Sequence, residues 1–514
     1  MSKTIIIIGA GLAGLSAALQ AAENGCNVKL VSSLPSERAQ TVMAEGGINA
    51  ALNTKDENDS PEEHFTDTIK AACGLADPNA VWGMTQAAPE LVHWLLKLGV
   101  KFNMSGYDDV DLRNFGGQKK KRTAFAQSDT GKQIMTAMID AVRRKEASGM
   151  VERFSHHSFL TLRLCGNICC GCVIRDEYSQ ETVELPGDAV IVATGGMHGL
   201  FGNTTGSLSN TGEVTAELFR LGVPLANGEM IQYHPTTVKC GGKRMLISEA
   251  ARGEGGRLFA MKDGKQWYFM EEKYPELGNL MPRDITAREI WKVSHESEVF
   301  LDMTEISEEI ISNKLSGLAD DCMTYLHKDI RKEPVSVLPG IHYFMGGILV
   351  DEQHRTPIQN LCAAGECCAQ YHGANRLGGN SLLGALYGGR VAAKSACEHA
   401  DVVDLSCATQ IDFPPASQIS EIKQLNKVMQ ETMGVVRNEN TLLNGIQTVQ
   451  ALTGNLPLLG MAVLKSALAR KESRGAHWRE DYPKSNDDDY LKTTVARFDG
   501  KQIQISFVPV PERR

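Results

Sequence analysis

The sequence predicts an α/β fold built around a buried parallel sheet that starts near the N-terminus. Residues 4–8, TIIII, are continuously apolar, which is typical of a strand covered on both faces. They lead into GAGLAG at residues 9–14, and then into an Ala- and Leu-rich segment that ends at Gly25. This order of strand, glycine turn and helix, followed by the apolar strand NVKLVSS, is the pattern of a βαβ unit.

The elements that follow are predicted by the same kinds of pattern. Residues 62–100 and 129–148 favour helices, with Pro78 and Gly99 as breaks in the first range. Residues 158–185 predict short antiparallel strands joined by turns. The segment DAVIVATGG then predicts another buried strand that runs into glycines, as the first strand does.

The middle and C-terminal parts of the chain differ from this pattern. From about Glu229 to Lys332 the sequence is richer in charged and aromatic residues, which indicates an inserted domain. Residues 418–475 favour helices apart from a break at TGNLPLLG, and the polar tail 476–514 contains the strand-like segment QIQISFVPV. Because 514 residues exceed one ordinary core, we expect several domains.

Composition argues against some classes of function. A net charge of -9 at pH 7 disfavours a nucleic-acid surface, which needs a basic excess. No apolar run is long enough to span a bilayer, and the apolar start leads into glycines, unlike a signal peptide. The 13 cysteines then predict reduced thiols and a cytoplasmic protein, not a framework of disulfides.

The glycine-rich turn at residues 9–14 indicates a nucleotide site. Gly9 permits the tight turn, Gly11 lets the backbone approach a pyrophosphate, and Gly14 allows the helix to pack on the strand. A plain turn between strand and helix is the alternative. The second strand ends in Ser32-Ser33, without the acid that holds the ribose of NAD, which favours FAD over NAD.

Histidine and arginine residues lie in extended or glycine-rich segments. His234 precedes a proline and is therefore extended, His342 lies in GIHYFMGG, and Arg376 stands in a glycine-rich turn before a helix. If these groups meet in apolar surroundings they would bind a small dianion, with arginine as a bidentate ligand. Ordinary core histidines are the alternative for His234 and His342.

Two charged segments each have two explanations. LISEAARGEGG carries Glu249, Arg252 and Glu254 among small and apolar residues, which fits either a solvated surface or a buried chain of acids and bases. MPRDITAR places Arg283 beside Asp284 before a predicted helix, and Asp284 as an ordinary helix cap explains that pair as well.

Two cysteine clusters and one basic run are interpreted as structural. We expect no metal site, because the first cluster lies on a predicted hairpin whose alternate residues point to opposite faces. The clusters are Cys169, Cys170 and Cys172, and Cys362, Cys367 and Cys368. The run KKKR at 119–122 is typical of a solvated face, with steering of anions as the alternative.

Taken together, the motifs resemble one family along nearly the whole chain. They are GAGLAGLSAAL, TVMAEGGINAA, FGGQKKKRTAF, ATGG, EMIQYHPT, LISEAARGEGG, HYFMGG, AAGE, HGANRLGGNSL and RKESRGAHWREDYP. In this order they resemble the flavoprotein subunit of succinate dehydrogenase and fumarate reductase, a family that includes L-aspartate oxidase. The resemblance implies a Rossmann-like FAD-binding domain (1–228 and 336–405), an inserted α+β capping domain (229–335), a helical domain (415–480) and a C-terminal tail (481–514).

The resemblance also implies a role for each matching residue. His342 and Arg376 would hold one substrate carboxylate, and His234 and Ser248 the other. Phe115 and Gly116 would close over the substrate, and Arg283 would donate a proton relayed by Glu249 and Arg252. The positions that match FAD-binding residues are Gly9, Ala10, Gly11, Gly14, Ser32, Thr41, Glu45, Gly46, Gly47, Thr194, Gly195, Glu213, Glu366, Arg376, Ser381 and Leu382.

One departure from the family changes the expected chemistry. Relatives in membrane complexes carry a histidine that bonds covalently to FAD, and this chain has Gln40 there. We therefore expect non-covalent FAD, which favours reduction of fumarate to succinate over the reverse reaction. The expected partners are a C4-dicarboxylate and an iron–sulfur subunit or another electron-donor protein, with any membrane association made through partner subunits.

Two other functions stay open at this point. L-aspartate oxidase shares most motifs and binds FAD non-covalently, but its substrate loop usually carries an acid that FGGQKKKRTAF lacks. The chain could also be an electron-transfer flavoprotein component that is active only in a larger complex. The physiological direction, the electron donor or acceptor and the oligomeric state are not predicted.

Overall fold

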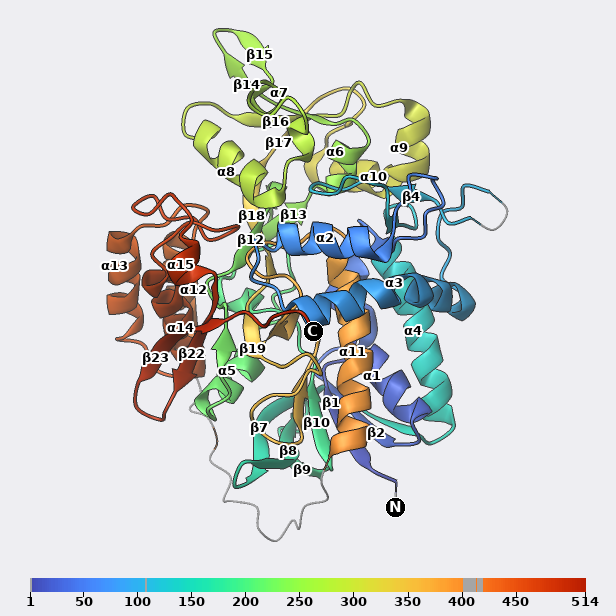
Figure 1. Ribbon diagram of the computed structural model, residues 1–514, viewed down its shortest axis with the longest axis vertical. Coiled ribbons are helices and arrows are strands. Elements are labelled where there is room, and N and C mark those ends of the chain that lie inside the picture. Colours follow the sequence, from blue (N-terminus) through green and yellow to red (C-terminus); the bar gives the residue numbers. More distant parts are fainter. Residues whose placement is uncertain (1, 107–108, 401–412, 414–418) are drawn as a thin grey trace.

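The computed structural model describes residues 2–106, 109–400, 413 and 419–514. Figure 1 shows a central body, an upper part that contains α6 to α9, and a lateral part that contains α12 to α14. The expected end of the FAD-binding domain at 405 and the expected start of the helical domain at 415 lie outside the described residues.

A five-stranded parallel sheet forms the centre of the body, as the apolar runs predicted. Its order is β20-β10-β1-β2-β6, and every neighbouring pair is parallel. Because β1 is flanked on both sides and covered on both faces, its isoleucines are almost completely buried. The strands are β1 (Thr4–Ile8), β2 (Asn27–Ser32), β6 (Val151–Ser155), β10 (Ala189–Val192) and β20 (Leu361–Ala363).

Helices cover one face of this sheet and a second sheet covers the other (Figure 1). Apolar side chains alternate between the two faces, so Ile5 and Ile7 pack on the helices, while Ile6 and Ile8 pack on the second sheet. The helices are α1 (Leu12–Glu23), α3 (Pro78–Leu98), α4 (Thr130–Ala147) and α11 (Asn380–His399). The second sheet is antiparallel, as predicted, with β7 (His157–Cys165), β8 (Ile168–Asp176) and β9 (Thr182–Pro186).

The region between residues 231 and 344 is mixed α and β. Its apolar cluster includes Leu258, Ile290 and Leu301 and is separate from the cluster around β1. One sheet has the order β15-β14-β16-β17: Lys265–Trp267, Arg257–Lys262, Val299–Asp302 and Val335–Ser336. The other has the order β13-β12-β18: Lys243–Leu246, Ile231–Cys240 and Leu338–Phe344. The helices are α6 (Glu249–Gly253), α7 (Phe269–Lys273), α8 (Arg283–Val293), α9 (Glu308–Lys314) and α10 (Ser316–Asp321).

The described C-terminal part contains four α-helices and two strands. The predicted break at TGNLPLLG is partly wrong, because α14 starts at Asn455 and continues through that motif. Pro457 lies in the first turn of α14, where a missing N–H does not interrupt the helical hydrogen bonds. The elements are α12 (Ile419–Thr432), α13 (Glu439–Val449), α14 (Asn455–Ala469), α15 (Asp487–Tyr490), β22 (Lys492–Phe498) and β23 (Ile503–Pro509).

The tail strands join a sheet made by earlier parts of the chain. Its order is β21-β19-β11-β22-β23, so β22 pairs directly with β11. The earlier strands are β11 (Leu225–Ala226), β19 (Gly347–Leu349) and β21 (Cys368–Ala369). Among the described residues, the remaining α-helices and strands of the body are α2 (Pro61–Ala71), α5 (Glu213–Arg220), β3 (Ile48–Asn49), β4 (Leu112–Arg113) and β5 (Thr123–Ala124).

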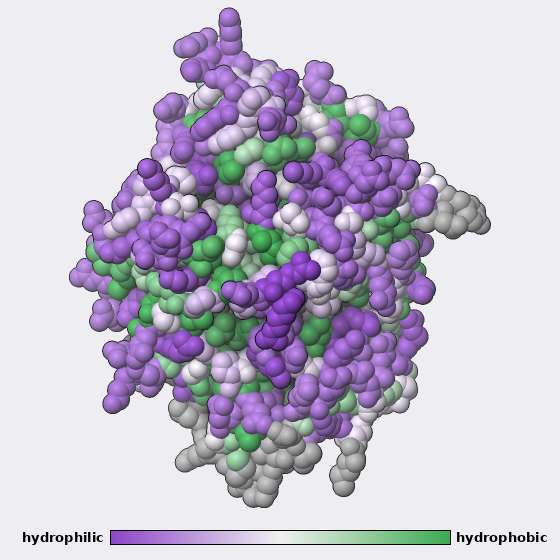
Figure 2. Space-filling view, viewed as in Figure 1, coloured by the Kyte–Doolittle hydropathy of each residue, from purple (hydrophilic) through white to green (hydrophobic). Residues whose placement is uncertain are grey.

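The face shown in Figure 2 is mainly hydrophilic, with smaller hydrophobic patches between the charged side chains. Among the described residues, no helix is both long and apolar enough to cross a bilayer. Eleven of the described cysteines are free thiols. Cys165 departs from the expected reduced state, because it is bonded in a disulfide.

Candidate active site

A cavity of about 560 Å³ extends from the carboxyl ends of the parallel strands to the sheet that contains β12 and β18. The carboxyl edge of a parallel sheet is where α/β folds bind their ligands. The predicted FAD residues that line the cavity are Gly9, Ala10, Gly11, Ser32, Thr41, Glu45, Gly46, Gly47, Thr194, Gly195, Glu213, Glu366, Arg376, Ser381 and Leu382. Of the predicted substrate and catalytic residues, Phe115, His234, Ser248, Glu249, Arg283, His342 and Arg376 also line it.

The glycine turn is shaped for close approach of a ligand to the backbone. A Cβ on Gly14 would lie 1.8 Å from the carbonyl oxygen of Gly9, so this glycine is required by the packing of α1 on the turn. A Cβ on Gly11 would meet only the Cβ of Ala39, at 3.8 Å. Gly11 therefore has no steric role within the protein itself, and its missing side chain leaves the floor of the cavity accessible.

Two polar atoms of residues that line the cavity are buried without a hydrogen bond to any described residue. They are the hydroxyl of Ser32, at the end of β2, and Oε2 of Glu45. Burial, reinforced by Asp321, raises the pKa of Glu45 to about 8. A dinucleotide offers hydroxyl and phosphate groups to such atoms, so the residues present fit FAD.

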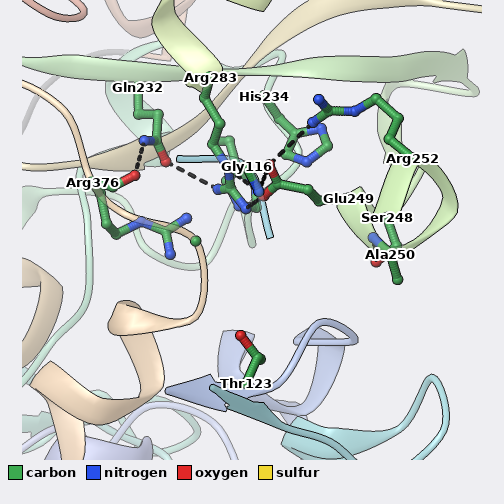
Figure 3. Close-up of polar contacts among 12 residues, drawn as sticks. Gly116, Thr123, Gln232, His234, Ser248, Glu249, Ala250, Arg252, Arg283 and Arg376 are labelled. Carbon is green, nitrogen blue, oxygen red and sulfur yellow. Dashed lines mark hydrogen bonds and ion pairs between the residues drawn. The ribbon is translucent and has the colours of Figure 1, made fainter. Parts of the chain in front are cut away.

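Glu249 is the centre of a buried charged network at the other end of the cavity (Figure 3). Its Oε2 accepts hydrogen bonds from Nε and Nη2 of Arg283, at 2.9 and 2.5 Å. Its Oε1 accepts from Nη2 of Arg252 at 3.3 Å and from the backbone N–H of Gly116 at 3.2 Å. Arg252 and Gly116 do not line the cavity, but both hold Glu249 in place.

Gln232 connects this network to Arg376. Its Oε1 accepts a hydrogen bond from Nη1 of Arg283 at 3.1 Å, and its Nε2 donates to the carbonyl oxygen of Arg376 at 2.8 Å. Figure 3 shows the two guanidinium groups directed toward the same space, one on each side of Gln232. The guanidinium of Arg376 also lies 4.4 Å from the ring centre of Tyr343, at cation–π distance.

The network has an excess of positive charge. Burial opposes ionisation of Glu249, but Arg283 and Arg252 together hold its pKa below the usual value. Burial and the nearby Arg283 lower the pKa of Arg376 to about 9, so Arg376 still carries its charge at pH 7. Three guanidinium groups therefore surround one carboxylate. A bound dianion would neutralise the two positive charges that Glu249 leaves unbalanced.

Two neutral histidines stand beside the arginines. The rings of His234 and His342 are 5.1 Å apart, edge to face. Burial and the charge of Arg283 hold the pKa of each ring well below its usual value. The hydroxyl of Thr205 lies 2.8 Å from Nδ1 of His342. If this hydroxyl donates, the ring proton is on Nε2, where it can be given to a carboxylate.

The alternatives for the charged segments can now be compared with the geometry. Glu249 and Arg252 are buried, so LISEAARGEGG is not a solvated surface. Asp284 does not occupy the N-cap position of α8. That position is Pro282, and α8 has no side-chain capping hydrogen bond. Ser248, by contrast, does cap α6 through the N–H of Ala250, at 3.4 Å.

Three side chains that contact the site, Gln232, Thr205 and His198, carry no role that the sequence motifs predict. Gln232 lies two residues before His234, and the alternation of side chains along a strand is a pattern that could have identified it. Thr205 and His198 come from the segment after β10, and nothing local in the sequence indicates which residues they touch.

The cysteines of the two clusters that the motif analysis singled out are free and buried. Cys169 and Cys172 have Cys-x-x-Cys spacing, and they lie in an apolar cluster with Val190 and Leu361. Within the described part of the chain, no group of three or more His, Cys, Asp or Glu side chains could hold a metal ion. Burial raises the pKa of Cys169 to about 12, which disfavours the thiolate that metals bind.

Fold and site together define a dinucleotide-binding protein with a buried anion site, and comparison with known proteins identifies its family. Residues 4–382 match the family model of the FAD binding domain, and residues 452–513 match the model described as fumarate reductase flavoprotein C-term. The chain therefore belongs to the FAD-dependent oxidoreductase family of succinate dehydrogenase and fumarate reductase flavoproteins, as the motifs predicted.

Individual relatives match along nearly their full length. The succinate dehydrogenase flavoprotein subunit of Bacillus subtilis is 37% identical, with 100% of this chain and 98% of that protein covered. The 8-methylmenaquinol:fumarate reductase flavoprotein subunit of Wolinella succinogenes is 32% identical, with coverages of 100% and 92%. Among solved structures, a mutant quinol fumarate reductase chain of E. coli is 28% identical with a TM-score of 0.90, and the coverages are 99% and 97%.

The glycine turn gives a test of the FAD site. Gly11→Ala should leave the stability of the apoprotein unchanged, because the new methyl group meets only Ala39 at ordinary contact distance. FAD affinity should fall by at least about tenfold, because the methyl group occupies the path of the pyrophosphate. Thermal unfolding of the apoprotein and FAD titration measure the two effects.

The matched control is Gly14→Ala, which should destabilise the apoprotein itself, because its Cβ clashes with the carbonyl of Gly9. Wild-type FAD affinity in Gly11→Ala would contradict the placement of the pyrophosphate at this turn.

Proposed function

We propose that the protein reduces fumarate to succinate as the flavoprotein component of a fumarate reductase. The observation that carries this proposal is the buried group of three arginines and two histidines around Glu249, which suits a small dianion. The names of the relatives support a C4-dicarboxylate as that dianion. FAD, when bound, supplies the hydride that reduces the double bond.

In this proposal the two substrate carboxylates are held at separate places. Arg376 and His342 hold one, with His342 oriented by Thr205. His234 and Ser248 hold the other, and Phe115 with Gly116 closes that end of the cavity. Held at both ends, the substrate cannot rotate, and the arginines withdraw electron density from its double bond.

Arg283 is the proposed proton donor to the second carbon. A guanidinium normally keeps its proton, so this role needs special surroundings. Two hydrogen bonds from Arg283 to Glu249 provide them, because Glu249, once it has received a proton through Arg252, can pass that proton over 2.5 Å to Arg283 after the transfer to substrate. Arg252, on the far side of Glu249, completes the proposed relay.

The same assignment gives the chain three proposed domains and a tail. Residues 1–228 and 336–405 form the FAD-binding domain, 229–335 the capping domain, 415–480 the helical domain, and 481–514 the tail. The cap contributes Arg283 and Glu249, while Arg376 comes from the FAD-binding domain, so the site is complete only when the two are packed together. An iron–sulfur subunit or another electron-transfer protein is the proposed source of electrons.

The flavin should be bound without a covalent link. Gln40 lines the cavity at the start of a short helical turn (residues 40–43), and its amide is not a nucleophile. Precipitation of the FAD-loaded protein with acid should therefore give a yellow supernatant and a colourless pellet. A pellet that keeps the flavin spectrum after washing would show that a covalent bond has formed elsewhere in the protein.

The reaction itself is tested with fumarate and reduced viologen, beside L-aspartate and oxygen. We expect turnover in the first assay only. Arg283→Ala should lower kcat by on the order of 10² to 10⁴, the range for loss of a proton donor, while FAD stays bound. Normal fumarate reduction by this variant, or turnover of L-aspartate by the wild type, would exclude the proposal.

A control variant is available on the same helix. The guanidinium of Arg288 lies 4.1 Å from the ring centre of Trp478, and Arg288 does not line the cavity. Arg288→Ala should therefore keep wild-type kcat. If fumarate is not reduced by the isolated chain but is reduced after addition of an electron-transfer partner, the site assignment stands and the chain is active only in a complex.

A further inference from the structure

His198 is a buried histidine that none of the roles described above uses. It lies in the segment that follows β10, and its ring packs edge to face on Phe344, with ring centres 5.0 Å apart. Gly206 passes so close that a Cβ there would lie 2.2 Å from the ring. The ring therefore has one well-defined orientation, fixed by contacts on both sides.

The groups around the two ring nitrogens of His198 favour one tautomer. Nδ1 of His198 lies 3.0 Å from the hydroxyl of Thr204. That hydroxyl already accepts a hydrogen bond from the N–H of Gly206, at 3.2 Å, so its own hydrogen is free to be donated. Thr204 can donate to Nδ1, and the Glu366 carboxylate opposite Nε2 favours the tautomer that carries its proton on Nε2.

Nε2 of His198 faces the carboxylate of Glu366. The distance from Nε2 to Oε1 of Glu366 is 3.5 Å. Nε2 is buried and makes no hydrogen bond to any described residue. The same Oε1 accepts a hydrogen bond from the backbone N–H of Phe344 at 3.1 Å, and a Cβ on Gly196 would lie 2.7 Å from it.

Glu366 lines the cavity together with Gly11, Thr194 and Arg376. A carboxylate beside a flavin disfavours reduction, because reduction adds negative charge to the ring. An N–H group that faces the carboxylate, here at an N–O distance of 3.5 Å, partly offsets the negative charge and so weakens this effect on reduction. The N–H group must keep a fixed position to offset the charge of Glu366. The contacts of the His198 ring with Thr204, Phe344 and Gly206 fix that position.

We propose that His198 is a positioning residue whose Nε2–H, turned toward Glu366, offsets part of the negative charge of that carboxylate and thereby raises the midpoint potential of the bound flavin. The inference rests on the assignment of the cavity to FAD and is independent of the identity of the substrate. It goes beyond the proposed function, because the wild-type flavin would then accept electrons from a weaker reductant than the variants lacking this donor.

The test is the midpoint potential of the FAD-loaded protein, measured by equilibration with redox dyes. His198→Asn keeps a polar group near Thr204 but cannot reach Glu366, and it should lower the equilibrium constant for two-electron reduction by about tenfold, or about 30 mV. His198→Gln places an N–H near the position of Nε2 and should restore most of the wild-type potential.

A double-mutant cycle separates this role from a structural one. In the Glu366→Gln background there is no carboxylate to hold, so His198→Asn should shift the potential no further. A wild-type potential in His198→Asn would overturn the proposal. An equal shift in both backgrounds would also overturn it, because the effect would then not pass through Glu366. If His198→Asn binds FAD too weakly for a measurement, His198→Gln alone decides. A potential lowered by about 30 mV in His198→Gln would contradict the proposal, because this variant keeps an N–H near Glu366.

Failure of this proposal is distinguishable from failure of the proposed function. Potentials that do not respond to His198, together with fumarate turnover, would remove only the role of His198. If the potentials respond as predicted but fumarate is not turned over, the role of His198 stands and the assignment of fumarate as the substrate is wrong.

Discussion

The ion pair between Glu249 and Arg283 is the interaction on which the rest of the site depends. Both side chains are removed from water, which costs free energy that only well-placed partners can offset. Arg252 and the N–H of Gly116 supply those partners on the side away from the cavity. Loss of either member of such a pair typically costs about 3–5 kcal/mol, because an unpaired charge stays buried.

This pair also joins regions of the protein that are distant in the sequence. Glu249 starts α6, Arg283 starts α8, and Gln232 on β12 connects Arg283 to Arg376 before α11. The parallel sheet presents the glycine turn, while the β12–β18 sheet presents the two histidines. The cavity therefore brings a dinucleotide site and an anion site into one space, which is the arrangement that transfer of hydride to a small acid requires.

The sequence predicted those parts of the molecule that depend on local pattern. The buried strand TIIII and GAGLAG identify the start of the sheet and its glycine turn, because strand and turn are encoded by neighbouring residues. Asp284 as a cap and the break at TGNLPLLG were wrong for the same local reason. Pro457 and Asp284 both lie in the first turn of a helix, where a proline and an acid are each favourable. Each helix therefore starts before the residue that the local pattern indicates as its boundary.

What the sequence could not predict are contacts between distant segments. Gln232 and Arg283 are 51 positions apart, and His198 meets Glu366 only because the segment after β10 folds against the end of β18. The resemblance to a known family identified the residues with named roles. It gave no role to Gln232, Thr205 or His198, and those roles follow from the packing alone.

The most direct test of the central claim is a crystal structure of the FAD-loaded protein with fumarate or malonate. One dianion should bridge His342 and Arg376 at one end and His234 and Ser248 at the other, beside the flavin, with Arg283 still bonded to Glu249. A dianion bound elsewhere, or a cavity in which Arg283 turns away from Glu249 when the anion binds, would contradict the account.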